Sequence, residues 1–203
     1  MIRNIIFDIG NVLVDFCWRQ HIEGCGYSGR TADRLGAAMM QSSAWHELDR
    51  GVWTEKEVLD AFIRNEPELE EEIHRVFENL GTIVREYPGT ASWLTSLKEA
   101  GYGLFYLSNF PAKVEREAGE QLSFLKYMDG GILSYRVREV KPGPAIYRLL
   151  LEQYGLKPEE CVFLDDSPEN IRTAETLGIK GIVVKNQEQA GEELKRLLEE
   201  ADR

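Results

Sequence analysis

Short apolar runs alternate with amphipathic segments over most of the chain. The apolar runs lie at residues 5–7, 103–107, 131–134, 161–164 and 181–184. Segments with helical spacing of apolar residues precede the last four of these runs, at residues 91–100, 112–122, 144–154 and 168–177. Buried strands that alternate with helices in this way are typical of βαβ units. The pattern therefore predicts an α/β fold with a doubly wound, Rossmann-like parallel sheet.

The segment after the first apolar run has a different pattern. From Cys17 to about Glu86 no stretch has the composition of a strand, and apolar residues recur at helical spacing. Thr54 and Glu57 form the signature of a capping box at the start of one of these helices. A Tyr-Pro-Gly sequence at residues 87–89 follows the segment. We therefore predict an α-helical bundle cap at residues 17–87, inserted into a core domain of residues 1–16 and 88–203.

Polar side chains follow the predicted strands at the points where the strands end. These residues are Asp8 after the first strand, Ser108 and Asn109 after the second, Lys141 in the loop after the third, and Asp165 and Asp166 after the fourth. Right-handed crossovers place the carboxyl ends of parallel strands at one edge of the sheet, where ligands bind. Each residue alone could simply cap a turn or a helix. Their coincidence at successive strand ends predicts a functional site.

The chemistry of this group points to a metal and a phosphate. Carboxylates packed together are costly unless a cation neutralises them. Mg²⁺ binds through one or two carboxylates together with the phosphate of a substrate. Asp8 could act as a nucleophile, because aspartate can form an aspartyl-phosphate intermediate. Lys141 could hold the negative charge, and Ser108 with nearby main-chain amides could bind phosphoryl oxygens.

Composition and charge indicate which kinds of partner and which cellular compartment to expect. The net charge of −11 argues against a nucleic-acid partner, since such a surface needs a basic patch. No apolar stretch approaches the roughly 20 residues of a membrane span, and the N-terminus lacks the apolar length of a signal peptide. Cys17, Cys25 and Cys161 form no CxxC pair and no zinc-binding set, so we expect free thiols in a reducing compartment. We expect a soluble, cytoplasmic monomer or homodimer with no membrane partner.

Four segments carry a resemblance to a known family. The segments IIFDIGNVLVD, LFYLSNF, VKPGPAIY and VFLDDSPENI resemble, in this order, the four motifs of the haloacid dehalogenase-like (HAD) hydrolase superfamily. The resemblance covers the whole chain and includes a helical cap inserted after the first motif, as in subfamily I. The DIGNV form and the sequence LDRGVWTEKEV in the cap are most similar to the branch of small sugar-phosphate phosphatases such as α-glucose-1-phosphate phosphatase.

This resemblance implies a role for each residue at the strand ends. Asp8 matches the nucleophile, which is also a Mg²⁺ ligand, and position 10 contributes its main-chain carbonyl to the metal. Ser108 matches the phosphate-binding hydroxyl, with Asn109 beside it, and Lys141 matches the lysine of the third motif.

The fourth motif completes the implied site. Asp166 matches a direct Mg²⁺ ligand, and Asp165 a group that acts through water or from behind the ligands. Asn170 lies where such proteins often have a residue that orients the Lys or the Asp. The implied cofactor is Mg²⁺, and the implied partner is a small phosphorylated metabolite.

One position departs from the family pattern. Many phosphatases of the family carry a second Asp two residues after the nucleophile as general acid and base, whereas this chain has Gly10. General acid–base assistance is worth about 10²–10⁴-fold in rate. His21, His46 and Asp15 are conceivable substitutes, or serve only in packing or at the surface. Arg19, beside Trp18 at the start of the cap, could bind the substrate or be structural.

The sequence thus supports a Mg²⁺-dependent phosphatase that acts on a small phosphorylated metabolite, with a sugar phosphate favoured. One alternative is a 2-haloacid dehalogenase, which uses the same nucleophile without a metal; the Asp165–Asp166 pair argues against it. A second alternative, suggested by Gly10, is a catalytically weak phosphate-binding regulatory protein.

Overall fold

The computed structural model describes residues 1–201, and its centre is a parallel sheet. The strands are β1 (Asn4–Phe7), β4 (Gly103–Ser108), β5 (Gly130–Leu133), β6 (Cys161–Asp165) and β7 (Lys180–Val183). They lie in the order β5-β4-β1-β6-β7, and every neighbouring pair is parallel. Each predicted apolar run is therefore a strand, and the predicted α/β fold is confirmed.

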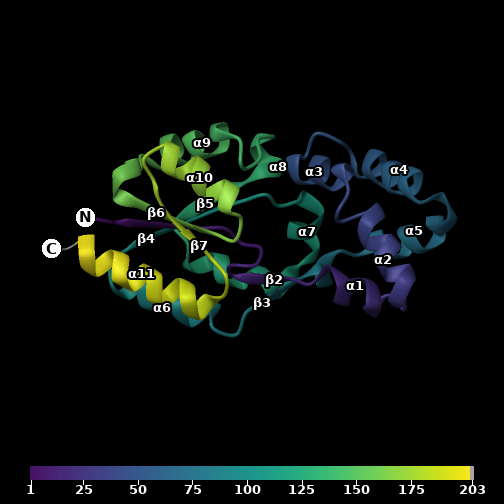
Figure 1. Cartoon of the computed structure of the whole chain (residues 1–203), viewed down its shortest axis with the longest axis horizontal. Helices are drawn as coiled ribbons and strands as arrows, with labels where there is room; N and C mark the ends of the chain where they lie inside the picture. Colours follow the sequence, from purple (N-terminus) through teal and green to yellow (C-terminus); the bar gives the residue numbers. More distant parts are fainter. Residues whose placement is uncertain (202–203) are drawn as a thin grey trace.

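Helices cover both faces of this sheet (Figure 1). They are α6 (Thr90–Glu99) and α11 (Gln187–Ala201) on one face, and α9 (Pro144–Tyr154) and α10 (Pro168–Thr176) on the other. The shorter segments are α7 (Ala112–Glu117) and α8 (Ser134–Val137), near the helical insertion, and the 3₁₀ segments η3 (Gly119–Tyr127) and η4 (Pro158–Glu160). Alternate side chains of β1 lie on opposite faces of the sheet. Ile5 and Phe7 belong to the apolar cluster that includes residues of α6 and α11, and Ile6 belongs to the cluster that includes residues of α9 and α10. Each such side chain contributes about 1.5–3 kcal/mol on burial.

A helical insertion, residues 18–78, lies between β1 and β4. It comprises α1 (Trp18–Gly24), α2 (Gly29–Ala38), α3 (Ser43–Arg50), α4 (Glu55–Asn65), η1 (Pro67–Leu69) and α5 (Glu70–Glu78), followed by η2 (Gly81–Ile83). The Thr54 hydroxyl accepts a hydrogen bond from the main chain of Glu57, and the Glu57 carboxylate accepts one from the main chain of Thr54, so the predicted capping box is present. The inserted helical region is confirmed, while its exact boundaries at 17 and 87 stay a prediction.

A small antiparallel ribbon joins the helical insertion to the core. Strand β2 (Val14–Phe16) pairs with β3 (Val84–Glu86), with Asp15 opposite Arg85. The expectation of no strand up to Glu86 is therefore wrong at β3. Three-residue strands are too short to show an alternating pattern, and their pairing joins segments far apart in the sequence. The ribbon gives the insertion two adjacent connections to the sheet.

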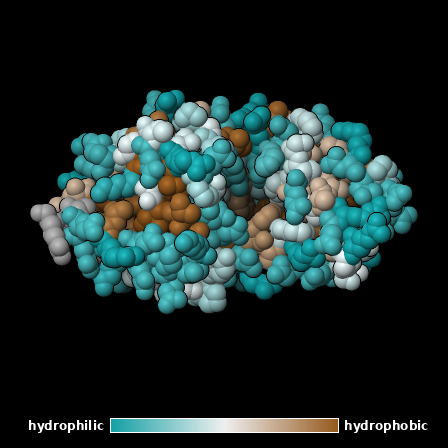
Figure 2. Space-filling model, viewed as in Figure 1, coloured by the Kyte–Doolittle hydropathy of each residue, from teal (hydrophilic) through white to brown (hydrophobic). Residues whose placement is uncertain are grey.

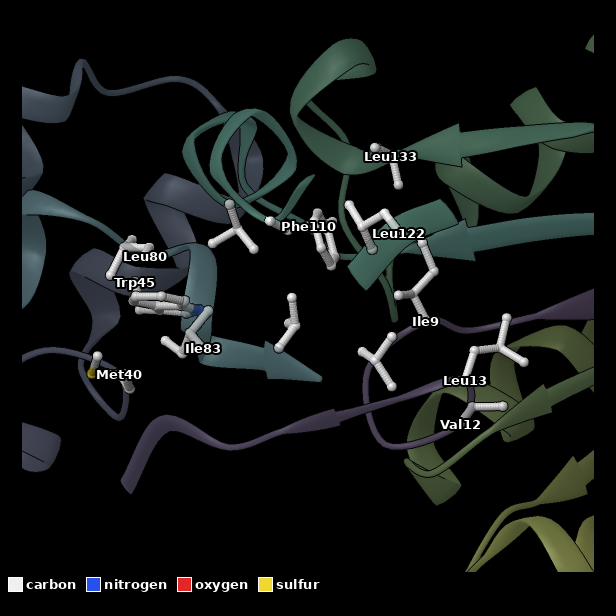
Figure 3. Packing of buried hydrophobic residues seen from close by; sticks show 14 of the residues in the cluster. Ile9, Val12, Leu13, Met40, Trp45, Leu80, Ile83, Phe110, Leu122 and Leu133 are labelled. Atoms are coloured by element: carbon white, nitrogen blue, oxygen red, sulfur yellow. The ribbon is translucent and has the colours of Figure 1, made fainter. Parts of the chain in front are cut away.

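One apolar cluster runs from the sheet into the helical insertion. Ile9, Phe110 and Leu133 from the core lie in the same cluster as Trp45 of α3 and Ile83 of η2 (Figure 3). Burial of these apolar side chains fixes the insertion against the carboxyl edge of the sheet.

Within residues 1–201, no helix is both long and apolar enough to cross a lipid bilayer. The compartment and the oligomeric state stay predictions.

Candidate active site

Asp8 lies at the carboxyl end of β1, where neighbouring groups hold it in place. Its main-chain amide donates to the carbonyl of Leu164 in β6 at 2.8 Å, and the amide of Ile9 donates to Asp8 Oδ1 at 2.8 Å. Ser108, at the end of β4, is buried, and its side chain lies near enough to the Asp8 carboxylate to lower the pKa of Asp8. Asp8 itself is 8% exposed, so the carboxylate is fixed at the base of the site.

Lys141 bridges two of the carboxylates predicted for the site. Its Nζ lies 2.9 Å from Asp8 Oδ1 and 2.6 Å from Asp165 Oδ2. Asn109 holds the main chain of Lys141 on both sides: its Oδ1 accepts from the Lys141 amide at 2.8 Å, and its Nδ2 donates to the Lys141 carbonyl at 2.9 Å. Asn109 therefore positions the loop that delivers the ammonium group.

Asp165, at the end of β6, has both of its carboxylate oxygens occupied. Oδ1 accepts from the amide of Ser167 at 2.8 Å, and Asn170 Nδ2 lies 2.9 Å from Oδ1 and 3.0 Å from Oδ2. Oδ2 also accepts from Lys141. Asp165 is fully buried, so these contacts supply the compensation that a buried charge requires.

Asp166, the next residue, lies closer to solvent. Its Oδ2 accepts from Asn11 Nδ2 at 2.8 Å. Asn11 has a left-handed backbone with φ of 55°, which asparagine tolerates better than most residues. The Asn11 Oδ1 in turn accepts from the amide of Phe16 at 3.3 Å, so the turn after β1 supports Asp166.

The three carboxylates form a group that fits a hard divalent cation. One oxygen from each of Asp8, Asp165 and Asp166 can be chosen so that all lie within 4.8 Å of one another. Lys141 is the ammonium group in contact with two of them. Three carboxylates against one ammonium leave an excess of negative charge, and oxygen donors suit Mg²⁺. Because the oxygens of Asp165 are occupied, Asp8 and Asp166 are the carboxylates open to a metal.

Electrostatics agree with this geometry. Burial raises the pKa of Asp8 to about 6, opposed by the charge of Lys141 and assisted by that of Asp165. Burial also raises the pKa of Asp166, despite the hydrogen bond from Asn11. For Lys141, burial lowers the pKa, but attraction to Asp165 and Asp8 outweighs it and the pKa is raised. Lys141 therefore stays charged, and a further cation would favour the ionised form of the carboxylates.

A cleft opens above these groups, between the sheet edge and the helical insertion, and Figure 2 shows it as a hollow between the two parts of the molecule. It holds about 560 Å³ of free space, part of it open to solvent. Its lining is Asp8, Gly10, Asn11, Phe16, Trp45, Asp49, Val84, Asn109, Phe110, Pro111, Val114 and Asp166. A cleft with this mixed polar and apolar lining suits a small molecule.

The structure does not bring every predicted residue to the cleft. Arg19 is on the outside of the helical insertion, where it pairs with Asp33 and lies over the Trp18 ring, and it is not part of the lining. The same is true of the candidate proton donors. His21 is buried between Thr82 Oγ1 and the carbonyl of Val76, at 2.7 and 2.9 Å, and burial lowers its pKa. His46 is exposed, and Asp15 lies in β2. Neither is among the described residues that line the cleft.

Asp49, which the sequence analysis missed, lies in the cleft. It belongs to α3, is 7% exposed, and its main-chain carbonyl accepts a hydrogen bond from the Ser134 hydroxyl of the core. Burial raises its pKa to about 8; the charge of Asp8 adds to this and Lys141 opposes it. Two signals were available: its place beside Leu48 in an amphipathic helix, and its position in the LDRGVWTEKEV segment that carries the resemblance. Neither distinguishes a cleft residue from a surface one.

An aspartate, a lysine and further carboxylates at the carboxyl edge of a parallel sheet, beneath inserted helices, define an α/β protein with a candidate active site at that edge. The family is shown by its model: residues 2–178 match the haloacid dehalogenase-like hydrolase model, and the chain belongs to that family. The resemblance seen in the sequence is thereby confirmed at the level of the superfamily.

Similar proteins include phosphatases and solved HAD enzymes. A phosphorylated carbohydrates phosphatase of Thermotoga maritima is 30% identical over 126 residues, which are 62% of this chain and 57% of that protein. Acyl-CoA dehydrogenase family member 10 of Mus musculus is 29% identical over 213 residues, 97% of this chain but 19% of that protein. The matches thus span less than two thirds of these relatives.

Two solved structures share the fold over nearly the whole chain. A HAD family enzyme from Bacteroides thetaiotaomicron, in complex with magnesium and inorganic phosphate, has a TM-score of 0.71 at 21% identity, covering 91% of this chain and 95% of that one. A HAD-like family hydrolase from Porphyromonas gingivalis has a TM-score of 0.73 at 24% identity and covers 98% of both chains. At this identity they show the fold alone.

Proposed function

We propose that this protein is a Mg²⁺-dependent phosphatase that hydrolyses a small phosphorylated metabolite through an aspartyl-phosphate intermediate on Asp8. The observation that carries the proposal is the contact of Asp8 Oδ1 with Lys141 Nζ, at 2.9 Å, at the base of a cleft that also contains Asp166. A carboxylate beside a fixed ammonium can attack phosphorus while the ammonium stabilises the charge that develops on the phosphoryl oxygens.

Each residue of the cluster has a part in this scheme. Asp8 supplies the nucleophilic oxygen, and Ser108 and Lys141 bind the phosphoryl group. Asn109 acts on Lys141 by holding its main chain, because both of its amide atoms are used there. Asp165 also acts on Lys141, by accepting a hydrogen bond from its ammonium group. Asn170 in turn fixes the Asp165 carboxylate.

We propose that Asp8, Asp166 and the main-chain carbonyl of Gly10 hold Mg²⁺, with Asp165 behind them. When bound, the ion would neutralise the carboxylates and the phosphoryl oxygens. The support is the donor set: oxygen atoms in excess of positive charge, with Asp166 kept in place by Asn11.

A sugar phosphate is the substrate that we favour. The relative from Thermotoga maritima is described as a phosphorylated carbohydrates phosphatase, and another relative, from Pasteurella multocida, as a phosphoglycolate phosphatase. The LDRGVWTEKEV segment supports the branch of α-glucose-1-phosphate phosphatase within subfamily I. We further propose that residues 17–87 act as the cap that selects the substrate. Arg19 is not included, because its guanidinium is engaged by Asp33.

The test is hydrolysis of p-nitrophenyl phosphate and of a panel of sugar phosphates by the purified protein. We expect phosphate release with Mg²⁺, none with EDTA, and none from Asp8→Asn. Asp60→Asn, in α4 with a side chain 43% exposed and paired with Lys56, is the matched control and should keep wild-type activity. Metal-dependent hydrolysis that survives Asp8→Asn would contradict the assignment. Metal-free chloride release from 2-haloacids would support the dehalogenase alternative, and tight phosphate binding without turnover the regulatory one.

A further inference from the structure

The cleft contains a carboxyl group to which the proposed function assigns no role. Of the described residues that line it, Asp8, Asp49 and Asp166 carry titratable side chains. Asp8 is the nucleophile and Asp166 the metal ligand in the proposed reaction. Asp49 remains, and it comes from α3 in the helical insertion rather than from the sheet edge.

The Asp49 carboxyl has no protein partner among residues 1–201. Neither the hydrogen bonds nor the ion pairs of the described chain involve its side chain, although the residue is only 7% exposed. Buried carboxyl groups are nearly always paired. Among the described residues, every fully enclosed polar side-chain atom has a hydrogen-bond partner. The unpaired oxygens of Asp49 are therefore not fully enclosed, and the space that they border is the cleft.

The position of Asp49 is fixed from the core. The buried hydroxyl of Ser134, just after β5, donates to the Asp49 carbonyl and accepts from the amide of Phe110 at 2.9 Å. Gly51, which ends α3 with φ of 68°, lies so close to Tyr135 that a Cβ there would be 2.8 Å from the Tyr135 carbonyl oxygen. This close approach holds the end of α3, and with it Asp49, at the cleft.

Gly10 leaves the site without a proton donor next to the nucleophile. A Cβ added at Gly10 would meet no atom within 4 Å, so the space beside Asp8 is open. Hydrolysis of an ester with a poor leaving group needs a proton at the departing oxygen.

We propose that Asp49 is the general acid and base of this site. The proposal rests on the proposed phosphatase function. Asp49 replaces, from the helical insertion, the proton transfer that Gly10 cannot provide.

The proton balance is closed over the two half-reactions. In the first, an Asp8 oxygen bonds to phosphorus and the bond from phosphorus to the ester oxygen breaks; the Asp49 proton passes to that oxygen, and the alcohol leaves. In the second, a water oxygen bonds to phosphorus, one proton of that water passes to Asp49, and the bond from phosphorus to Asp8 breaks. Phosphate departs, Asp8 is a carboxylate again, and Asp49 holds its proton.

The electrostatic surroundings of Asp49 support this role. Burial raises its pKa to about 8, with repulsion from Asp8 in addition and with Lys141 opposing. Asp166 also lines this cleft. A carboxyl group in these surroundings keeps its proton near neutral pH, as an acid catalyst must.

The experiment compares kcat/KM of the wild type and Asp49→Asn over phosphate esters with progressively poorer leaving groups: p-nitrophenyl phosphate, phenyl phosphate and glucose 6-phosphate. This parameter reports the step in which the alcohol leaves. For phenyl phosphate we expect a loss of about 10²–10⁴-fold, and for p-nitrophenyl phosphate, whose anion leaves without a proton, less than about tenfold. Glu47→Gln, on the same helix, should match the wild type.

Two further measurements separate proton transfer from a structural role. Adding Gly10→Asp to Asp49→Asn should restore kcat/KM for phenyl phosphate by about tenfold or more, because the open space accepts the new carboxyl. The fall of kcat/KM at alkaline pH should disappear in Asp49→Asn.

An equal loss for all esters, without recovery on adding Gly10→Asp, would overturn the proposal and make Asp49 a group that binds substrate. A wild-type protein that hydrolyses none of the esters would instead refute the phosphatase function, and the inference with it. Circular dichroism of Asp49→Asn should match the wild type, which excludes loss of the fold.

Discussion

The Ser134 hydroxyl of the core donates a hydrogen bond to the main-chain carbonyl of Asp49 in the helical insertion. The same hydroxyl accepts from the amide of Phe110 in the core. One fully buried side chain thus joins the end of the sheet to the residue that we assign to proton transfer.

Ser134→Ala should weaken both stability and catalysis. The variant leaves a buried amide and a buried carbonyl unpaired, at a cost of about 1–3 kcal/mol. We expect a lower unfolding midpoint in urea and a fall in kcat/KM for phenyl phosphate that exceeds the fall for p-nitrophenyl phosphate. Ser96→Ala removes an exposed hydroxyl of α6 and serves as the control. Equal kinetics for Ser134→Ala and Ser96→Ala would show that the contact does not position Asp49.

Lys141→Met should destabilise the fold strongly. The Lys141 side chain is 1% exposed and pairs with two buried carboxylates, so its removal costs about 3–5 kcal/mol. Without the ammonium, the pKa of Asp8, which burial already raises to about 6, rises further above that of the unfolded chain. Folded-state stability is then retained at low pH and lost as the pH rises through the raised value. Urea unfolding in EDTA should show a larger deficit at pH 8 than at pH 5.

The control for this variant is Lys157→Met, whose side chain is 66% exposed. It should unfold like the wild type at both pH values. A deficit of Lys141→Met that is independent of pH would mean that lost packing, rather than unpaired carboxylates, is responsible.

Mg²⁺ should raise the melting temperature of the wild type. An ion that binds the folded state alone stabilises it by about 2.7 kcal/mol at 100 times its dissociation constant. Differential scanning fluorimetry in EDTA and in increasing MgCl₂ measures this shift. Asp166→Asn should reduce the shift and Asp60→Asn should not, because Asp60 is paired with Lys56 away from the cleft. An unchanged shift in Asp166→Asn would remove Asp166 from the proposed ligands.

Asp49→Asn should stabilise the metal-free protein, increasingly so as the pH rises. The Asp49 pKa rises from 3.8 to about 8 on folding, so the folded state binds the proton more tightly than the unfolded state does. The wild type therefore loses stability between these values as the pH rises, whereas asparagine does not titrate. The difference in melting temperature should grow from pH 5 to pH 8, at about 2–4 °C for each kcal/mol. A constant difference would show that Asp49 titrates normally.

Gly51→Ala should lower the melting temperature. The position has a left-handed backbone, which costs a residue with a Cβ about 1–2 kcal/mol, and the Cβ would also clash with Tyr135. Gly191→Ala is the matched control: it lies within α11 with no atom near its Cβ, so alanine should stabilise the helix by about 1 kcal/mol. Equal melting temperatures for the two variants would contradict the close packing of α3 on the core.

The sequence by itself determined the sheet and the cluster at its edge. The apolar runs of β1, β4, β5, β6 and β7 are buried between two layers of helices, so each is continuous enough to be recognised from composition. Parallel connections then bring Asp8, Ser108 and Asp165 to one edge. Lys141 joins them from the loop that Asn109 holds. The helical insertion was predictable for a similar reason, because its helices have long amphipathic patterns.

Only the tertiary structure decided which groups complete the site. The β2–β3 ribbon depends on pairing between residues 14–16 and residues 84–86, and no local sequence pattern reveals that pairing. Arg19 of α1 forms an ion pair with Asp33 of α2 at the surface, and sequence spacing does not reveal this pairing. Asp49 looks like an ordinary polar residue in α3 until the helix is packed on Ser134 and Tyr135. Burial of a side chain, and therefore its pKa and its reach into a cleft, is a property of packing between distant segments and not of the local sequence.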